Sequence, residues 1–352
     1  MIKILHSADW HLDSPLQLGS EEQSRFLRQA LKKIPQKIAA AAKAQNCDLV
    51  LLAGDLFDGI YTGDTLQSLK NSLEEMAVPV FIAPGNHDFV SLDSPWLKEV
   101  FPENVHIFTQ PTVTYQDIPQ LDLRVYGGGF TSMDCAGMLE HFREESPMTY
   151  NIGIFHGDPT QTNSPYCPIT SQQVKNSNFD YLALGHIHKG DAFRAGKTLC
   201  AWPGCPMGRG YDETGEKGVL LVTLADSVEA EFLPLDTPRF YDLQIAPDAL
   251  SATLPPVGNT DFYRITLTGP SEPLDLDALK AEYSRFPNLM LRDATVLPVD
   301  VWSSAGEDTF EGVYFKLLHD ALEHADADTQ RQIRLAAKIS RQILDKQEVV
   351  LP

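Results

Sequence analysis

The chain has 352 residues, of which 43% are hydrophobic and 22% charged, which predicts an ordinary globular protein with two domains, or one large domain with appendages. It contains no run of 18 apolar residues, and its first residues lack a basic segment with a cleavage site, so neither a membrane span nor a secretory signal is expected. The net charge of −20 argues against a simple nucleic-acid-binding protein, because such proteins neutralise phosphates with Lys and Arg.

Five short, mostly apolar segments predict buried strands, and a polar cluster follows each of them. The segments are residues 2–5, 48–52, 78–82, 152–155 and 181–184. The clusters are Asp9-Trp10-His11, Gly54-Asp55, Gly85-Asn86-His87-Asp88, His156-Gly157-Asp158 and Gly185-His186-Ile187-His188. Strands buried on both faces have such apolar runs, and layered α/β folds gather ligands in the loops at strand ends. We therefore expect Asp, His and Asn side chains from five loops to meet at one site.

Helices are predicted between the first strands. Ser20-Glu21-Glu22-Gln23 has the form of a capping box, and residues 26–34 after it keep apolar residues at helical spacing. Pro35 is expected to break or restart this helix. A second helix is expected over residues 65–76, which completes the strand–helix–strand rhythm of βαβ units.

Strand patterns prevail from residue 121 to residue 235. Two mixed sheets packed face to face between helices would accommodate both this half and the βαβ half before it. Pro234 and Pro238 mark an expected linker. Residues 240–246 and 261–269, around a Pro-Pro-Val-Gly turn, then a helix over 276–286 and a strand over 289–299 predict a small β-β-α-β unit. Residues 310–352 predict two helices. The expected domains are therefore residues 1–235, 236–305 and 306–352.

The second of these terminal helices is predicted to have a basic stripe. Its members are Arg331, Arg334, Lys338 and Arg341. A solvated helix surface explains such a stripe, and so does a face that docks a partner or DNA.

The residue types in the five clusters suit a pair of transition-metal ions. Carboxylate and amide oxygens together with imidazole nitrogens favour Mn²⁺, Fe²⁺ or Zn²⁺ over Ca²⁺. Paired catalytic ions lie roughly 3.5–4 Å apart and repel each other, so one carboxylate must lie between them. Asp55, at a glycine-preceded strand end, is the candidate bridge. Such a pair supports in-line attack of hydroxide on a phosphate, and His87 is the candidate acid for the leaving oxygen.

Each cluster also has an ordinary explanation when it is taken alone. The alternatives are a turn or helix cap for Asp9 and Asp55, a tight turn for Pro84-Gly85-Asn86, a core position for His156, and a surface pair for His186 and His188. One shared site explains why all five clusters occur in this order. Five unrelated turns would not explain that order. Asp58, Asp88 and Asp158 are candidates either for orienting ligands or for capping loops, and His6 is expected to be structural.

In this order the clusters resemble the motifs of the calcineurin-like metallophosphoesterases. Residues 7–15 (Ser-Ala-Asp-Trp-His-Leu-Asp-Ser-Pro) and 52–59 (Leu-Ala-Gly-Asp-Leu-Phe-Asp-Gly) are similar to those of the SbcD-type DNA repair exonucleases. The His-Leu-Asp-Ser-Pro form is most similar to the YhaO branch. The motif resemblance covers residues 1–235, and a weaker pattern continues to about residue 300. It implies a four-layer α/β/β/α sandwich with the β-β-α-β unit as a cap that helps to select DNA ends, followed by the terminal helices. The alternative for the β-β-α-β unit is an appendage that only stabilises the fold.

The resemblance also implies roles for individual residues. It implies that Asp9, His11 and His188 hold one metal ion, that Asn86, His156 and His186 hold the other, that Asp55 bridges both, and that His87 contacts the scissile phosphate or protonates the leaving oxygen. The implied metal is Mn²⁺ and the implied substrate a DNA phosphodiester. The implied partner is an SMC-like coiled-coil ATPase. A homodimer is a further possible assembly.

We therefore expect a metal-dependent phosphodiesterase, a DNA repair exonuclease acting with an ATPase. The alternative is a phosphatase or nucleotide hydrolase with the same metal site, which the net charge favours. A second alternative is a scaffold that binds DNA ends or the ATPase with little catalysis, and the complete ligand set argues against it. The five cysteines are scattered and odd in number, which fits reduced thiols in a cytoplasm.

Overall fold

The computed structural model describes residues 1–298 and 300–345. The chain divides into two compact units. The first contains residues 1–243 together with 255–265 and 280–291, and the second contains the remaining segments. Among the described residues, no helix is both long and apolar enough to cross a lipid bilayer.

The first unit contains two six-stranded sheets. The elements of its first half are β1 (Ile2–Ser7), α1 (Glu21–Leu31), α2 (Ile34–Ala44), β2 (Leu49–Leu52), α3 (Gly63–Glu75), β3 (Val80–Ile82), α4 (Pro95–Lys98) and β4 (Val105–Ile107). Those of its second half are β5 (Thr114–Ile118), η1 (Pro119–Leu121), β6 (Leu123–Gly127), β7 (Tyr150–His156), α5 (Ser171–Ser177), β8 (Tyr181–Gly185), β9 (Lys189–Ala195), β10 (Thr198–Gly204), β11 (Gly218–Leu224) and β12 (Val228–Pro234).

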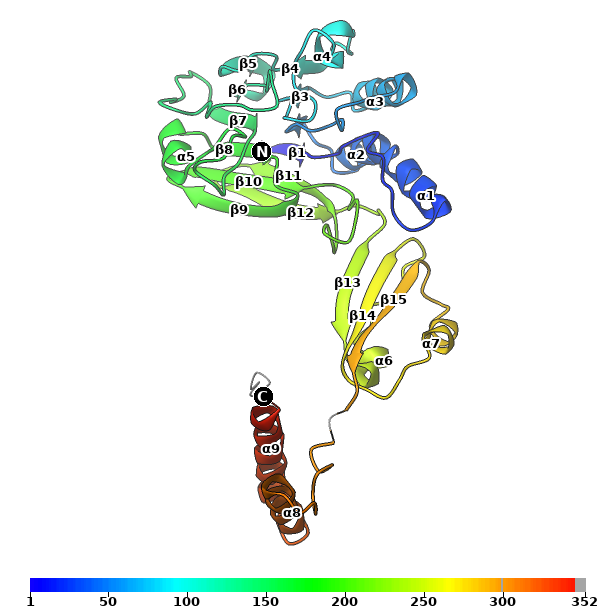
Figure 1. Cartoon of the computed structure of the whole chain (residues 1–352). Helices are drawn as coiled ribbons and strands as arrows, with labels where there is room; N and C mark the ends of the chain where they lie inside the picture. Colours follow the sequence, from blue (N-terminus) through cyan, green and yellow to red (C-terminus); the bar gives the residue numbers. More distant parts are fainter. Residues whose placement is uncertain (299, 346–352) are drawn as a thin grey trace. The chain divides into compact units, whose positions relative to one another are not determined.

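Both sheets are mixed, with a parallel centre (Figure 1). The first sheet has the order β12-β11-β1-β2-β3-β4, in which β1 to β4 run parallel and β11 and β12 add antiparallel pairings. The second has the order β5-β6-β7-β8-β10-β9, with antiparallel pairings at both edges. Parallel strands are covered on both faces, which explains why the apolar runs in the sequence are continuous rather than alternating.

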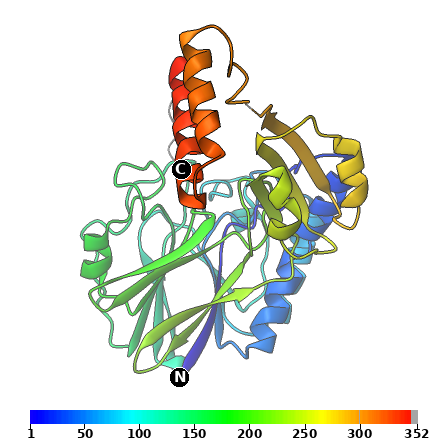
Figure 2. The same ribbon diagram turned by 90° about the horizontal axis from the view of Figure 1, so that it is seen from below.

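Three apolar clusters separate the layers. One lies between the sheets and joins Ile4 and Leu51 to Val125 and Ile152. A second packs the outer face of the first sheet under α1, α2 and α3, and a third packs the second sheet under α5. Figure 2 shows these helices on the two outer faces. The expected α/β/β/α sandwich is confirmed.

The helix boundaries follow the sequence signals closely. Ser20 forms the expected capping box with Gln23 at the start of α1, and α2 restarts with Pro35 in its first turn. Helix α3 begins after Thr62, whose side chain accepts a hydrogen bond from the Thr65 N–H. These helices are the crossover connections that parallel neighbouring strands need.

The sequence after β12 forms a three-stranded sheet and two terminal helices. Its elements are β13 (Phe240–Ile245), η2 (Pro247–Ala249), α6 (Leu250–Thr253), β14 (Phe262–Pro270), α7 (Leu276–Glu282), β15 (Leu289–Val296), α8 (Phe310–Leu322) and α9 (Ala327–Leu344). The sheet order is β13-β14-β15. Hydrogen bonds from the Phe262 N–H to the Arg239 carbonyl and from the Tyr263 N–H to the Asn288 carbonyl join the starts of all three strands, which are therefore parallel.

Two details of this region differ from expectation. Parallel strands need a crossover, so η2 and α6 connect β13 to β14 instead of the expected turn alone. The side chain of Arg341 is not part of an exposed basic stripe, because it is buried, hydrogen-bonds Ser304 and lies 4.3 Å from the Phe315 ring centroid. The expected strand over 289–299 and the expected helix to residue 352 extend, at 299 and 346–352, outside the described residues.

Candidate metal centre

All eight residues predicted for the site lie at the carboxyl ends of strands in the two sheets. Asp9 and His11 follow β1, Asp55 follows β2, Asn86 and His87 follow β3, His156 ends β7, and His186 and His188 lie between β8 and β9. Because parallel strands end at the same edge of a sheet, loops that are far apart in sequence become neighbours there.

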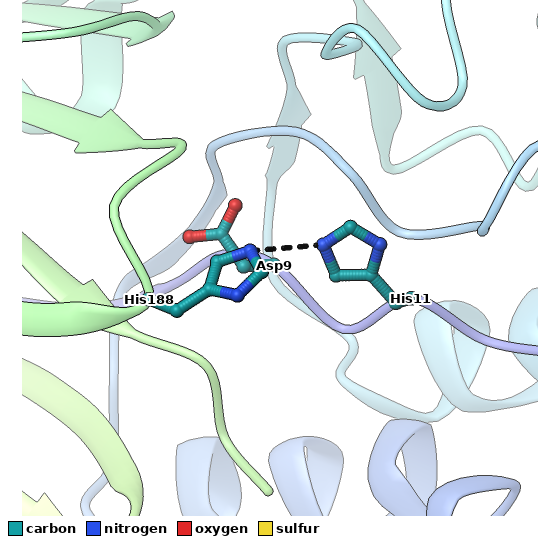
Figure 3. A group of neighbouring side chains, drawn as sticks. All are labelled: Asp9, His11 and His188. Carbon is teal, nitrogen blue, oxygen red and sulfur yellow. Dashed lines mark hydrogen bonds between the residues drawn. The ribbon is translucent and has the colours of Figure 1, made fainter. Parts of the chain in front are cut away.

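The first donor group consists of Asp9, His11 and His188, whose ligand atoms all lie within 4.8 Å of one another. Figure 3 shows the two imidazole rings facing each other with the carboxylate beside them, and the two Nε2 atoms are 3.1 Å apart. Nitrogen ligands lie about 2.1 Å from a first-row ion, so two of them at a right angle are about 3 Å apart. This pair of nitrogens therefore has the spacing that one ion requires.

The second donor group is centred on His156. Its Nε2 lies 3.0 Å from Asn86 Oδ1 and 3.3 Å from Asp55 Oδ2. The same Asp55 oxygen lies 3.7 Å from His11 Nε2. One carboxylate oxygen therefore stands between an imidazole of the first group and an imidazole of the second.

His186 lies beside this second group rather than within it. Its ring centroid is 5.2 Å from that of His156, and its ring also contacts Tyr166. Its backbone N–H donates to Asp9 Oδ1 at 2.9 Å. Among the described His, Cys, Asp and Glu residues, it belongs to none of the groups whose donor atoms converge.

Three histidines have their Nδ1 atoms occupied in the same manner. His156 Nδ1 lies 2.9 Å from the Ala53 carbonyl, His11 Nδ1 lies 3.0 Å from Asp58 Oδ1, and His188 Nδ1 lies 2.7 Å from Glu213 Oε1. An acceptor at Nδ1 keeps the proton there and leaves the Nε2 lone pair free as a ligand. All three Nε2 atoms face the cluster, so the donor set fits a metal centre.

The backbone at the site is held in an uncommon conformation. Asp9, His11, Asp55 and His186 have φ values of 55°, 48°, 51° and 97°, a region that L-residues rarely occupy and that surrounding structure must enforce. The glycines of the motifs permit the close approach. A Cβ on Gly85 would lie 2.3 Å from Asp55 Oδ1, so no other residue fits there without movement.

Buried charges at the site favour a cation beside the carboxylates. Burial alone would lower the pKa of His156, but Asp55 and Asp9 raise it to about 9. Burial would likewise raise the pKa of Asp55, and His156 and His11 bring it well below its usual range. A proton and a metal ion compete for the same nitrogen, so the potential that retains a proton on His156 also attracts a metal ion.

His87 lies at the rim of the cluster and is half exposed. Its Nδ1 lies 3.0 Å from Asp58 Oδ1, the oxygen that also contacts His11. This contact with Asp58 raises the pKa of His87 although partial burial opposes it. Asp58 therefore connects a metal-cluster histidine to the candidate acid.

The remaining expectations have distinct outcomes. Asp88 accepts hydrogen bonds from the Gly85 and Leu56 N–H groups and orients the site loops, and burial followed by repulsion from Asp55 raises its pKa to about 7. Asp158 caps its own loop through the Thr160 and Gln161 N–H groups. His6 is structural as expected, because it is buried and bonded to Tyr181 and to the Leu184 carbonyl.

Two residues of the site were missed by the sequence reasoning. Glu213 contacts His188 and also accepts a hydrogen bond from Arg209 Nη2 at 2.9 Å. Arg209 Nη2 lies 3.1 Å from His188 Nδ1 as well. Both come from the segment between β10 and β11, which has no recognisable motif. The one available signal was that Arg209 and Glu213 are opposite charges four residues apart, a spacing that allows an ion pair.

Residues 2–190, more than half of the chain, match the family described as Calcineurin-like phosphoesterase. The chain belongs to this family, as its motifs predicted. It is a metallophosphoesterase with a His/Asp metal-binding cluster, of the dimetal type that is typical of the family.

Two curated relatives refine this placement. "Uncharacterized metallophosphoesterase YhaO" of Bacillus subtilis is 31% identical over 240 residues, which cover 63% of this chain and 57% of that protein. The SbcD subunit of the nuclease SbcCD from Staphylococcus saprophyticus is 24% identical over 269 residues, which cover 66% of this chain and 69% of that protein. The chain thus matches somewhat more than half the length of YhaO.

Solved structures with a similar chain path include one from Thermus thermophilus and one from Danio rerio. TT1561 of Thermus thermophilus is 17% identical with a TM-score of 0.40, and the match covers 66% of this chain and 98% of that one. A dimetal phosphatase from Danio rerio is 12% identical with a TM-score of 0.42, and the match covers 66% of this chain and 96% of that one.

Proposed function

We propose that the protein is a metal-dependent phosphodiesterase that acts on DNA as an exonuclease. The observation that carries the phosphodiesterase chemistry is the position of Asp55 Oδ2, 3.3 Å from His156 Nε2 and 3.7 Å from His11 Nε2. A shared carboxylate at this place is what two neighbouring cations need. The similarity to a protein named as part of a nuclease supports the DNA substrate.

The proposed ligands follow from the two donor groups. Asp9, His11 and His188 would hold one ion, Asn86 and His156 would hold the other, and Asp55 would be shared. His186, which lies beside the second group, is proposed as its further ligand on the family resemblance alone. Mixed nitrogen and oxygen donors fit Mn²⁺. When bound, such a pair of ions supplies Lewis-acid activation of the phosphate and a nucleophile at neutral pH.

The chain's own residues complete the chemistry. Asp58 holds the Nδ1–H of His87, so the other nitrogen of the ring is available to the substrate. The raised pKa of His87 keeps a larger share of the imidazole protonated near neutral pH. His87 is therefore proposed to donate a proton to the leaving oxygen.

The test of this proposal is Asp55→Asn, which removes the shared charge while it preserves size. We expect hydrolysis of phosphodiesters to be lost with any divalent metal. Asp226→Asn, at an exposed position, is the matched control and should retain activity. Full activity of the Asp55 variant would contradict the assignment.

A second candidate function is a phosphatase or nucleotide hydrolase with the same metal site. The net charge of −20 favours it, because an acidic surface repels a long polyanion more than a small one. Protein loaded with Mn²⁺ is to be compared on duplex DNA, single-stranded DNA, a nucleotide and a phosphomonoester. Turnover of DNA above that of both small substrates supports the exonuclease, and the reverse order supports the alternative.

The organisation of the C-terminal third remains a proposal as well. Residues 236–305 would act as a cap over a DNA end, and residues 306–352 would dock an SMC-like ATPase. The name of the Staphylococcus relative, which identifies one component of a nuclease, supports a partner protein. Deleting residues 306–352 should abolish co-purification with the ATPase while hydrolysis of a small phosphodiester persists, and unchanged co-purification would refute the docking role.

A further inference from the structure

A cleft of about 500 Å³ opens beside His188. Its lining residues come from β9 and β10 at one edge of the second sheet, from β11 and β12 at one edge of the first, and from residues 214–217 between β10 and β11. This volume falls within the roughly 300–1,000 Å³ of small-molecule sites. His188, a predicted metal ligand, is one of the residues that line the cleft.

One exposed aromatic side chain lines the cleft. The other aromatic residue of the lining, Trp202, packs its indole into the apolar cluster that contains Cys200 and Phe193. Phe232 is 42% exposed on β12. Its ring packs over Gly218, where a Cβ would lie 2.9 Å from Phe232 Cζ. An exposed ring held in place offers a platform on which a planar group can stack.

Lys217 gives the same cleft an unmet positive charge. The residue is only 8% exposed, and within the described residues its side chain has neither an ion pair nor a hydrogen bond. Its Nζ is not among the described buried atoms that lack a hydrogen-bond partner, so the ammonium reaches solvent although most of the residue is covered. An accessible ammonium of this kind can pair with an anionic ligand. Lys189 also lines the cleft, whereas the acidic Glu216 is neutralised by Arg239 at 2.7 Å. The remaining acid of the lining, Asp191, is exposed.

We propose that this cleft binds one nucleoside phosphate, with its base stacked on Phe232 and its phosphate neutralised by Lys217. An exposed aromatic ring and a lysine that lines the same cleft are complementary to the two halves of that ligand. The proposal rests on the proposed function, because His188, a proposed metal ligand, lines the cleft. The nucleoside phosphate is either the terminal unit of a DNA strand or a free nucleotide.

The experiment measures equilibrium binding of two probes, dAMP and deoxyribose 5-phosphate, to the full-length Mn²⁺-loaded protein. Stacking of a base on an aromatic side chain corresponds to roughly five- to hundredfold in affinity, so dAMP should bind more tightly by that factor. Phe232→Ala should bring the ratio of the two dissociation constants close to one. Lys217→Met should weaken both probes by the same factor and leave the ratio unchanged.

Matched controls separate these effects from loss of structure. Phe310→Ala removes an aromatic side chain that is 84% exposed on α8, and Lys43→Met removes a lysine far from the cleft in sequence. Both controls should bind the two probes as the unchanged protein does. The metal content of the Phe232 and Lys217 variants reports whether the centre beside the cleft is intact, and Phe232→Leu, which keeps an apolar side chain without the ring, replaces Phe232→Ala if that variant fails to fold.

The outcomes distinguish this site from the proposed function. An unchanged dAMP preference in the Phe232 variants, or unchanged affinity for both probes in Lys217→Met, contradicts nucleotide binding in the cleft, even if the protein hydrolyses DNA. If the protein hydrolyses no phosphodiester but both variants behave as expected, the proposed function fails and the cleft stands. A dinucleotide that shows the same Phe232 dependence as dAMP identifies the strand terminus as the ligand, and dependence for dAMP alone identifies a free nucleotide.

Discussion

Replacing Glu213 tests whether a residue outside the ligand set controls the metal centre. Its carboxylate lies 2.7 Å from His188 Nδ1 and is bonded to Arg209 as well. Glu213→Gln keeps the shape but removes the charge that holds the proton on Nδ1. His188 can then rotate or carry the proton on Nε2, the nitrogen that faces His11.

The size of the effect follows from this geometry. A short charge-assisted hydrogen bond contributes about 1.5–3 kcal/mol, and about 1.4 kcal/mol is a factor of ten in affinity. Loss of an orienting partner behind a ligating histidine commonly lowers metal affinity by about 10–100-fold. We therefore expect Glu213→Gln to weaken one of the two metal sites by about tenfold and Glu213→Ala by up to about a hundredfold.

Calorimetric titration of the metal-free protein with Mn²⁺ measures both affinities. Glu216→Gln is the matched control, since Glu216 lies three residues away and pairs with Arg239 instead of the cluster. Its Mn²⁺ affinities should equal those of the unchanged protein. Equal affinities for the Glu213 variants would refute the reasoning, because His188 would then be held without its carboxylate partner.

Two further predictions concern histidines with opposite roles. His87→Ala should retain its metal content while phosphodiester hydrolysis slows by roughly 10²–10⁴-fold, and metal analysis that shows loss of an ion would make His87 a ligand instead. Burial lowers the pKa of His6 from 6.5 to about 3. Below pH 6.5 the imidazole is therefore protonated in the unfolded chain, whereas it stays neutral in the folded chain until the pH approaches 3. The stability that neutral His6 contributes is complete above pH 6.5 and is lost as the pH falls toward 3. The free energy of unfolding should therefore decline with falling pH more steeply, by up to about 1.4 kcal/mol per pH unit, than in His6→Asn, and equal slopes in chemical denaturation would contradict this.

The metal cluster was predictable because each of its parts is local in sequence. A buried strand, a glycine and a polar residue are adjacent in Gly54-Asp55 and in Gly85-Asn86, and strand ends meet wherever parallel strands pair. The close approach of Gly85 to Asp55 shows why the glycine belongs to the motif. The layers of the sandwich followed from the same apolar runs.

Features that depend on a fold-back of the chain were not predictable. Glu213 reaches His188 because the segment after β10 folds back to the metal cluster. No pattern of apolar and polar residues in that segment predicts this path. Arg341 fits a basic stripe on a helical projection, yet Phe315 and Ser304 bury it. The residue pattern of β14 predicts a strand but not its direction relative to β13. The same pattern therefore also fitted an antiparallel pair joined by a tight turn.

The charge of −20 and a DNA substrate are compatible if recognition occurs within the cleft rather than over a surface. Each phosphate that a protein neutralises on a single strand adds about −0.7 to the slope of log affinity against log salt concentration. With Lys217 and Lys189 as the cations of the cleft, the slope for a short oligonucleotide should lie between about −0.7 and −1.4. Fluorescence anisotropy over a salt series measures it. A slope several times steeper would mean that many phosphates are contacted, and the single-nucleotide account of binding would then be wrong.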